Sequence, residues 1–206
     1  MERRELLYLG ALSFIASRAY AGGYPEYPVE LVGSYQASKS KNGLAVAALP
    51  LDDKVEQQRY FSLEFRPKGF LPVFIVLSNE SPERSYIVKT DDITIATGDE
   101  EPSSKGDSGI VSGRSKAGEG LLIASGIALS LAGSLVAAHM MVKAAAVKQN
   151  IIKKELRSLT LSPGQTAHGF LYVPVTKGPG TREKLRLRLR GLSVGADEPV
   201  DITLAF

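Results

Sequence analysis

Apolar and polar positions alternate with the period of a β-strand through much of residues 22–97. The alternation over residues 61–66, with Phe61, Leu63 and Phe65 on one side, predicts a half-buried strand. Residues 71–77 are nearly all apolar and predict a central strand. Residues 86–89 and 93–96 predict two further short strands. We therefore expect residues 22–97 to form the first half of a β-rich domain.

Residues 157–206 show the same period again. Pro163 and Gly164 occupy the central positions of a predicted type II turn, and strands are predicted at residues 168–175, 184–192 and 200–206. About seven short strands, separated by turns and with no helix among them, predict a mainly β fold in which two sheets form a sandwich.

Two short motifs carry a family resemblance. Residues 70–79 read Phe-Leu-Pro-Val-Phe-Ile-Val-Leu-Ser-Asn, and residues 161–173 read Leu-Ser-Pro-Gly-Gln-Thr-Ala-His-Gly-Phe-Leu-Tyr-Val. This pair resembles the telokin-like, immunoglobulin-fold domains of bacterial envelope proteins, in which an apolar strand ends in asparagine and a Pro-Gly turn with a second apolar strand follows. The resemblance implies an immunoglobulin-like β-sandwich in the cell envelope and brings no catalytic residues. The long segment between the two motifs departs from the pattern.

The N-terminus has the layout of a signal peptide spanning residues 1–21. Arg3 and Arg4 form a basic region, residues 6–17 are uncharged, and Ala19-Tyr20-Ala21 supplies an A-x-A cleavage signature. The uncharged run is short for a membrane-spanning helix. An uncleaved anchor or a buried N-terminal helix is the alternative, and the paired arginines leave the twin-arginine route open beside the general one. We expect an exported, periplasmic and membrane-associated protein.

The two β-rich halves are separated by a polar linker and a predicted helical insertion. Residues 98–118 are rich in Gly, Ser and acidic residues, as in a flexible linker. The insertion covers residues 119–156, and its residues 121–142 contain no Lys, Arg, Asp or Glu. Roughly 20 apolar residues suffice to cross a bilayer core, so a transmembrane helix is one interpretation. The alternative is a helix, or a hairpin bent near Gly133, that packs on the sandwich in an aqueous compartment.

Small residues recur within the apolar run at a spacing that favours close packing of two helices. The candidate helix-packing residues are Gly126, Ser130, Gly133, Ser134, Ala137 and Ala138. They predict self-association or pairing with a partner helix.

Topology limits how such a helix enters a membrane. Strands of one sandwich lie on one side of a bilayer, because backbone pairing cannot cross it. The insertion therefore returns as a hairpin, lies on the membrane, or stays outside it. Two separate β domains in different compartments remain a further alternative.

The alternation in residues 184–192 also creates a candidate anion-binding surface. Arg186, Arg188 and Arg190 share one face, with guanidinium groups about 7 Å apart, and this row suits phosphate or carboxylate groups. The alternatives are an ordinary solvated face, or an edge strand charged against aggregation.

Composition narrows the chemistry further. The 206 residues fit one domain plus an insertion, 44% are hydrophobic, and the formal net charge of +3 does not predict a nucleic-acid partner. The chain has no cysteine and only two histidines, and no motif brings His139 and His168 together. We therefore expect no catalytic residues, no metal and no cofactor.

These patterns lead to one expected function and two rivals. The expected function is that of a non-enzymatic envelope protein whose β-sandwich is a binding or structural module. Its helical insertion joins the sandwich to a membrane or to an envelope protein partner. The first rival is a helix-driven membrane oligomer, or a pore-like assembly, with the sandwich as a collar. The second is a hydrolase or metal-handling enzyme on the same scaffold.

Overall fold

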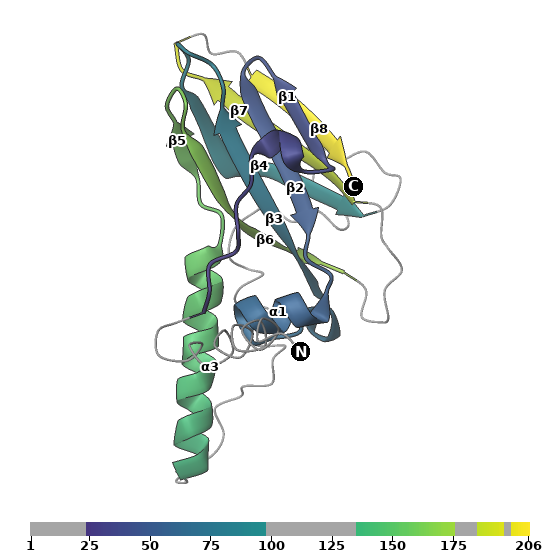
Figure 1. The fold of residues 1–206 in the computed structure, drawn as a ribbon, viewed down its shortest axis with the longest axis vertical. Coiled ribbons are helices and arrows are strands. Elements are labelled where there is room, and N and C mark those ends of the chain that lie inside the picture. Colours follow the sequence, from purple (N-terminus) through teal and green to yellow (C-terminus); the bar gives the residue numbers. More distant parts are fainter. Residues whose placement is uncertain (1–23, 98–134, 176–184, 196–198) are drawn as a thin grey trace, which may run out of the picture.

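Two antiparallel sheets of four strands each form the body of the molecule (Figure 1). The computed structural model describes residues 24–97, 135–175, 185–195 and 199–206, with the backbone alone at 96–97 and 135–143. In strand order, the first sheet contains β1 (Ser38–Lys41), β2 (Leu44–Pro50), β3 (Phe70–Asn79) and β6 (Thr166–Pro174). The second contains β5 (Leu159–Leu161), β4 (Tyr86–Thr97), β7 (Leu185–Ser193) and β8 (Pro199–Ala205). The chain is therefore mainly β, as the alternation predicts, and the two sheets form a sandwich.

The main core lies between the sheets. Val73, Ile75 and Leu77 of β3 pack in one cluster with Leu187 of β7 and Ile202 of β8, and all five side chains are fully buried. Removal of this apolar area from water is the main force that joins the sheets.

A second cluster covers the outer face of the first sheet and is rich in aromatic rings. It is covered by helix α1 (Lys54–Phe61), by residues 24–35, here called the strap, and by the end of helix α3 (Leu135–Lys154). Its aromatic members are Tyr27, Tyr60, Phe61, Phe65, Phe74, Phe170 and Tyr172. Because β3 is covered on both faces, residues 71–77 are all buried. This confirms the predicted central strand and explains its nearly continuous apolar sequence.

Two sequence predictions are wrong in this region. The predicted strand at residues 61–66 is the end of α1 followed by a turn and the 3-10 helix η2 (Arg66–Lys68). Asp53 caps α1 by accepting a hydrogen bond from the Glu56 amide at 2.9 Å. The rings of Phe61 and Phe65 then contact each other in the aromatic cluster beyond the end of α1, with 5.0 Å between their centres. As a consequence, a helix does interrupt the strands, between β2 and β3.

The two strands predicted at residues 86–89 and 93–96 are one strand, β4, whose pairing with β7 shifts between Val88 and Ile93. A bulge of this kind breaks the period-two pattern without ending the strand. Strands β6, β7 and β8 agree with the predictions for residues 168–175, 184–192 and 200–206 to within a few residues. Strands β1, β2 and β5 are not predicted individually.

Asn79 joins the segments 70–79 and 161–173. Its buried side-chain amide donates to the carbonyls of Arg84 and Leu161, at 2.6 and 3.0 Å. Its backbone exchanges hydrogen bonds with the turn at residues 162–165, since its amide donates to Gln165 and its carbonyl accepts from Gly164. The asparagine at the end of β3 thus fixes the Pro-Gly turn beside it.

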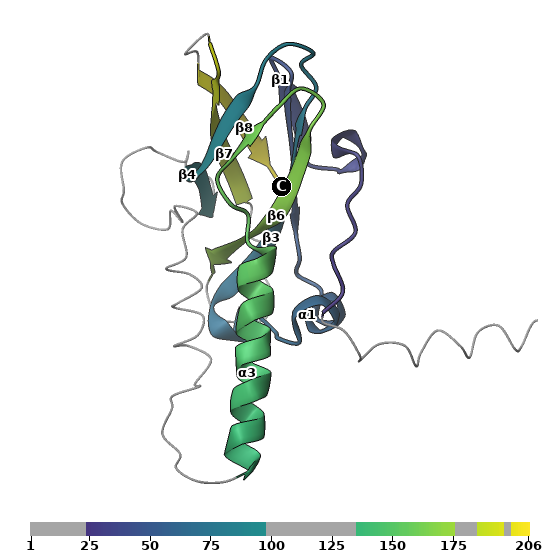
Figure 2. The same ribbon diagram turned by 90° about the vertical axis from the view of Figure 1, so that its left-hand side faces the viewer.

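Helix α3 leaves the sandwich at the end that carries α1 and extends beyond it (Figures 1 and 2). It includes part of the predicted insertion, while residues 98–134 and the predicted signal peptide lie outside the described residues. Among the helices that the structure describes, none is both long enough and apolar enough to cross a membrane.

The chain after α3 crosses β6 at Gly169. Leu156 donates its amide to the Phe170 carbonyl at 3.0 Å. A Cβ atom on Gly169 would stand 2.6 Å from the Leu156 Cα, which is closer than two carbon atoms can approach. The absence of a side chain at Gly169 therefore lets the end of α3 lie against the sheet.

Gly169→Ala is expected to destabilise the protein by about 2 kcal/mol, because backbone rather than a mobile side chain must move. Thermal unfolding followed by circular dichroism measures this as a lower Tm. Gly33→Ala is the matched control, since a Cβ there meets nothing within 4 Å. Equal Tm values for the two variants would contradict the close packing.

Candidate functional site at the base of helix α3

Among the α3 residues whose side chains the structure describes, 144–154, the buried ones lie at the C-terminal end of the helix. Ala145, Ala146, Lys148 and Gln149 are exposed, whereas Asn150, Ile151 and Lys154 are 7%, 4% and 6% exposed. The buried residues are spaced so that they share one helix face. The helix is therefore attached by its C-terminal end.

The Lys154 ammonium lies at the centre of this attachment. Its Nζ donates to the Tyr60 carbonyl at 2.8 Å and to the Pro25 carbonyl at 2.6 Å. It also stands 5.1 Å from the centre of the Phe61 ring and 5.7 Å from that of Tyr60, within the range of cation–π attraction. One side chain thus joins α3, α1 and the strap.

The contact with α1 is favourable because of where Tyr60 lies. Tyr60 is in the last turn of α1, where carbonyls lack partners within the helix and carry the negative end of its dipole. Asn150 also donates to the Tyr60 carbonyl, at 2.8 Å. The end of α3 therefore caps the end of α1.

The strap contributes three consecutive residues, Pro25, Glu26 and Tyr27, to the attachment of α3. Pro25 supplies the carbonyl for Lys154, and the Glu26 carboxylate accepts a hydrogen bond from Lys153 Nζ at 2.5 Å. The buried ring of Tyr27 lies 4.8 Å from Tyr60 and 4.7 Å from Phe74. The strap is therefore held by polar contacts to α3 and by aromatic packing on the sheet.

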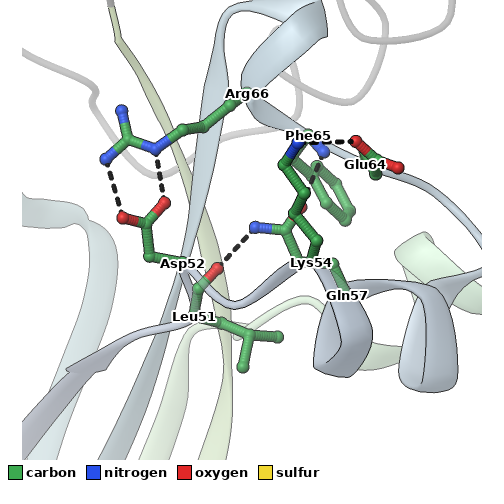
Figure 3. Close-up of polar contacts among 7 residues, drawn as sticks. All are labelled: Leu51, Asp52, Lys54, Gln57, Glu64, Phe65 and Arg66. Carbon is green, nitrogen blue, oxygen red and sulfur yellow. Dashed lines mark hydrogen bonds and ion pairs between the residues drawn. The ribbon is translucent and has the colours of Figure 1, made fainter. Parts of the chain in front are cut away.

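Helix α1 is itself fixed by a network of polar contacts (Figure 3). The buried Gln57 side chain donates to the Leu51 carbonyl at 2.7 Å and accepts from the Phe65 amide at 2.8 Å. Arg66 binds the Asp52 carboxylate through two nitrogens, Nε and Nη2. These contacts close the 51–66 loop and give Lys154 a fixed partner.

Burial and local contacts shift the pKa values of several groups at this site. Loss of hydration lowers the pKa of Lys154 to about 8. The pKa of Glu26 is lowered, first by its hydrogen bond from Lys153 and then by the nearby positive charges. Burial raises the pKa of Tyr172, whose hydroxyl stays protonated and donates to the Ile151 carbonyl at 3.1 Å.

A small recess opens beside the attachment. It is lined by Glu26, Tyr27, Phe74, Lys153, Lys154, His168, Gly169 and Phe170. Its volume of about 60 Å³ has room for a few water molecules. The site attaches helix α3 to the rest of the fold, because backbone carbonyls of two other segments accept hydrogen bonds from Lys154. Among the described residues, no group of three or more His, Asp or Glu side chains is placed to hold a metal ion.

The three predicted anion-binding arginines form one row on the outer face of the second sheet. Arg186, Arg188 and Arg190 alternate with the buried Leu185, Leu187 and Leu189. Strand β7 lies between β4 and β8, so it is an interior strand and needs no charge to protect an edge. Arg188 Nη2 lies 3.6 Å from Asp201 Oδ1 of β8. Anion binding by this row stays a prediction.

Two of the six predicted helix-packing residues lie among the described residues. Ala137 and Ala138 belong to α3, while Gly126, Ser130, Gly133 and Ser134 lie outside the described residues. Helix pairing therefore also stays a prediction.

Sequence reasoning did not single out the residues of the attachment. Asn150, Ile151 and Lys154 share a helix face, and this spacing was the available signal. It does not identify the partners, because the acceptors of Lys154 are backbone carbonyls 94 and 129 residues away in sequence. A carbonyl has no sequence signature.

Comparisons with protein-family models, with curated proteins and with solved structures find no match to this chain.

Lys154 makes folding stability depend on pH. Its pKa of about 8 in the folded state is below its ordinary value of 10.5, so the cost of burying the charge is full below pH 8 and falls as pH rises toward 10.5. From pH 7 to 9.5 the wild type should gain stability relative to Lys154→Met by on the order of 1 kcal/mol. Urea unfolding of both proteins at the two pH values measures the difference. Parallel pH profiles would show that the ammonium is not buried.

Proposed function

We propose that this chain is an exported, non-enzymatic protein of the bacterial envelope. Its β-sandwich is held to a membrane, or to an envelope protein partner, through the helical insertion. The observation that carries the proposal is the attachment of α3, which is fixed to the sandwich by buried contacts of its last turn and extends away from it (Figure 2). A helix fixed in this way transmits the position of whatever it joins to the whole sandwich.

The sequence of α3 supports a joining role. The helix spans 20 residues, which corresponds to about 30 Å at 1.5 Å per residue. Its first eight residues, 135–142, belong to the uncharged run, and the run therefore continues into the part of the helix distant from the sandwich. Exposed residues such as Ala145 and Gln149 separate this part from the buried last turn.

The fold class and the compartment are part of the proposal. An immunoglobulin-like classification is supported by the two packed antiparallel sheets. It is also supported by Asn79, which connects the two motifs, residues 70–79 and 161–173, that resemble those of envelope domains. A long insertion between the sandwich halves is supported by the position of α3 between β4 and β5. Export is supported by the signal-peptide layout of residues 1–21.

The proposal is tested by fractionation of bacteria that produce the full chain. We expect the wild type in the membrane pellet after carbonate extraction. The double variant Ile127→Lys with Leu131→Lys should move to the supernatant, because two charges in the uncharged run oppose insertion. Val194→Lys is the matched control, since Val194 is 51% exposed in the turn after β7, and it should remain with the pellet.

Release of the wild type as a free monomer by osmotic shock would overturn attachment both to a membrane and to a partner. Gel filtration in detergent separates the rival form of the proposal: a large, uniform assembly would favour a helix-driven oligomer with a sandwich collar, and a monomer would exclude it.

A further inference from the structure

Helix α3 connects the uncharged run of residues 121–142, whose last eight residues it contains, to one fixed point of the folded body. The Pro25 carbonyl and the Lys154 ammonium are in contact at 2.6 Å although they are 129 residues apart in sequence. Lys154 follows the uncharged residues 121–142 in sequence. This contact therefore fixes the place from which α3 leads away toward that run.

The connection between this run and the attachment is short. Residue 142 precedes Lys154 by 12 residues of continuous helix, which corresponds to about 18 Å. This distance is smaller than the roughly 30 Å hydrocarbon thickness of a bilayer. If residues 121–142 enter a membrane, the base of α3 must lie near that membrane.

The end of the sandwich opposite α1 is built from turns. The Glu80 amide donates to the Gly43 carbonyl at 2.7 Å, the Asn79 amide to Gln165 at 2.9 Å, and the Val194 amide to Ser85 at 2.9 Å. These bonds bring the β1–β2, β3–β4, β5–β6 and β7–β8 connections to one end, called here the turn end (Figure 1). Strand β2 starts at the turn end and leads to α1.

The strand that leads into the insertion also runs from the turn end toward the opposite end of the sandwich. Strand β4 begins at Tyr86, directly after the turn end, and runs away from it to Thr97. The chain therefore leaves for the insertion, and returns from it along α3, on the side away from the turn end (Figures 1 and 2).

We propose that the α1–α3 end of the sandwich faces a lipid membrane, with the turn end directed away from it. This inference rests on the proposed function, because it takes the uncharged residues 121–142 to enter the membrane. It adds the orientation: α1 and the base of α3 are membrane-proximal, and the Val194 turn is membrane-distal.

Single-cysteine labelling tests the orientation, since the chain has no cysteine of its own. Val55→Cys marks α1 and Val194→Cys marks the turn end; these side chains are 76% and 51% exposed. Each full-length protein is labelled with one fluorophore and reconstituted in phosphatidylcholine–phosphatidylglycerol vesicles whose headgroups carry a nitroxide quencher. The label at residue 55 should be quenched several-fold more strongly than the label at residue 194.

Equal or reversed quenching in vesicle-bound protein would overturn the orientation and leave membrane attachment intact. Failure of the protein to float with the vesicles would instead overturn membrane attachment itself. Circular dichroism verifies that each variant is folded. A second pair, Gln149→Cys near the base of α3 and Glu83→Cys at the turn end, replaces any member of the first pair that fails to fold, because both side chains are exposed.

Discussion

The contact between the Lys154 ammonium and two backbone carbonyls is the interaction on which the arrangement of this molecule depends. The sandwich core would hold the two sheets together without it. The position of α3, however, depends on the last turn of the helix, where Lys154 and Asn150 bind the carbonyl end of α1. A charged group this deeply buried is costly unless its hydrogen bonds are made. The carbonyls of Tyr60 and Pro25, together with the faces of two aromatic rings, offset part of that cost. The remaining part lowers the pKa of Lys154 to about 8.

Three segments from distant parts of the chain reach this contact, and each has its own reason for being there. The polar network around Gln57 fixes α1, Tyr27 fixes the strap by packing among aromatic rings, and Gly169 lets the chain after α3 lie against β6. The outer face of the first sheet is thus a platform on which helix and strap are assembled. The outer face of the second sheet carries the arginine row of β7. The two faces of one sandwich therefore differ in chemistry.

The sequence predicts strands β3, β6, β7 and β8 because burial leaves a periodic signal in them, whereas it does not single out β1, β2 and β5. Strand β7 alternates Leu and Arg, and β3 is continuously apolar because it is covered on both faces. The prediction fails at α1, where Phe61 and Phe65 imitate alternation but meet across a helix end. It also fails to identify the Lys154 site, because the acceptors are backbone atoms placed there by the fold. Side-chain patterns show that a residue is buried more readily than they show what it binds.

Lys154 fixes α3 rigidly to the sandwich. The most direct test is the distance distribution between spin labels on Gln149→Cys of α3 and Glu83→Cys at the turn end, measured by pulsed electron paramagnetic resonance. We predict one narrow distribution in the protein with Lys154 intact, and a broad one after Lys154→Met. A broad distribution with Lys154 intact would contradict the claim.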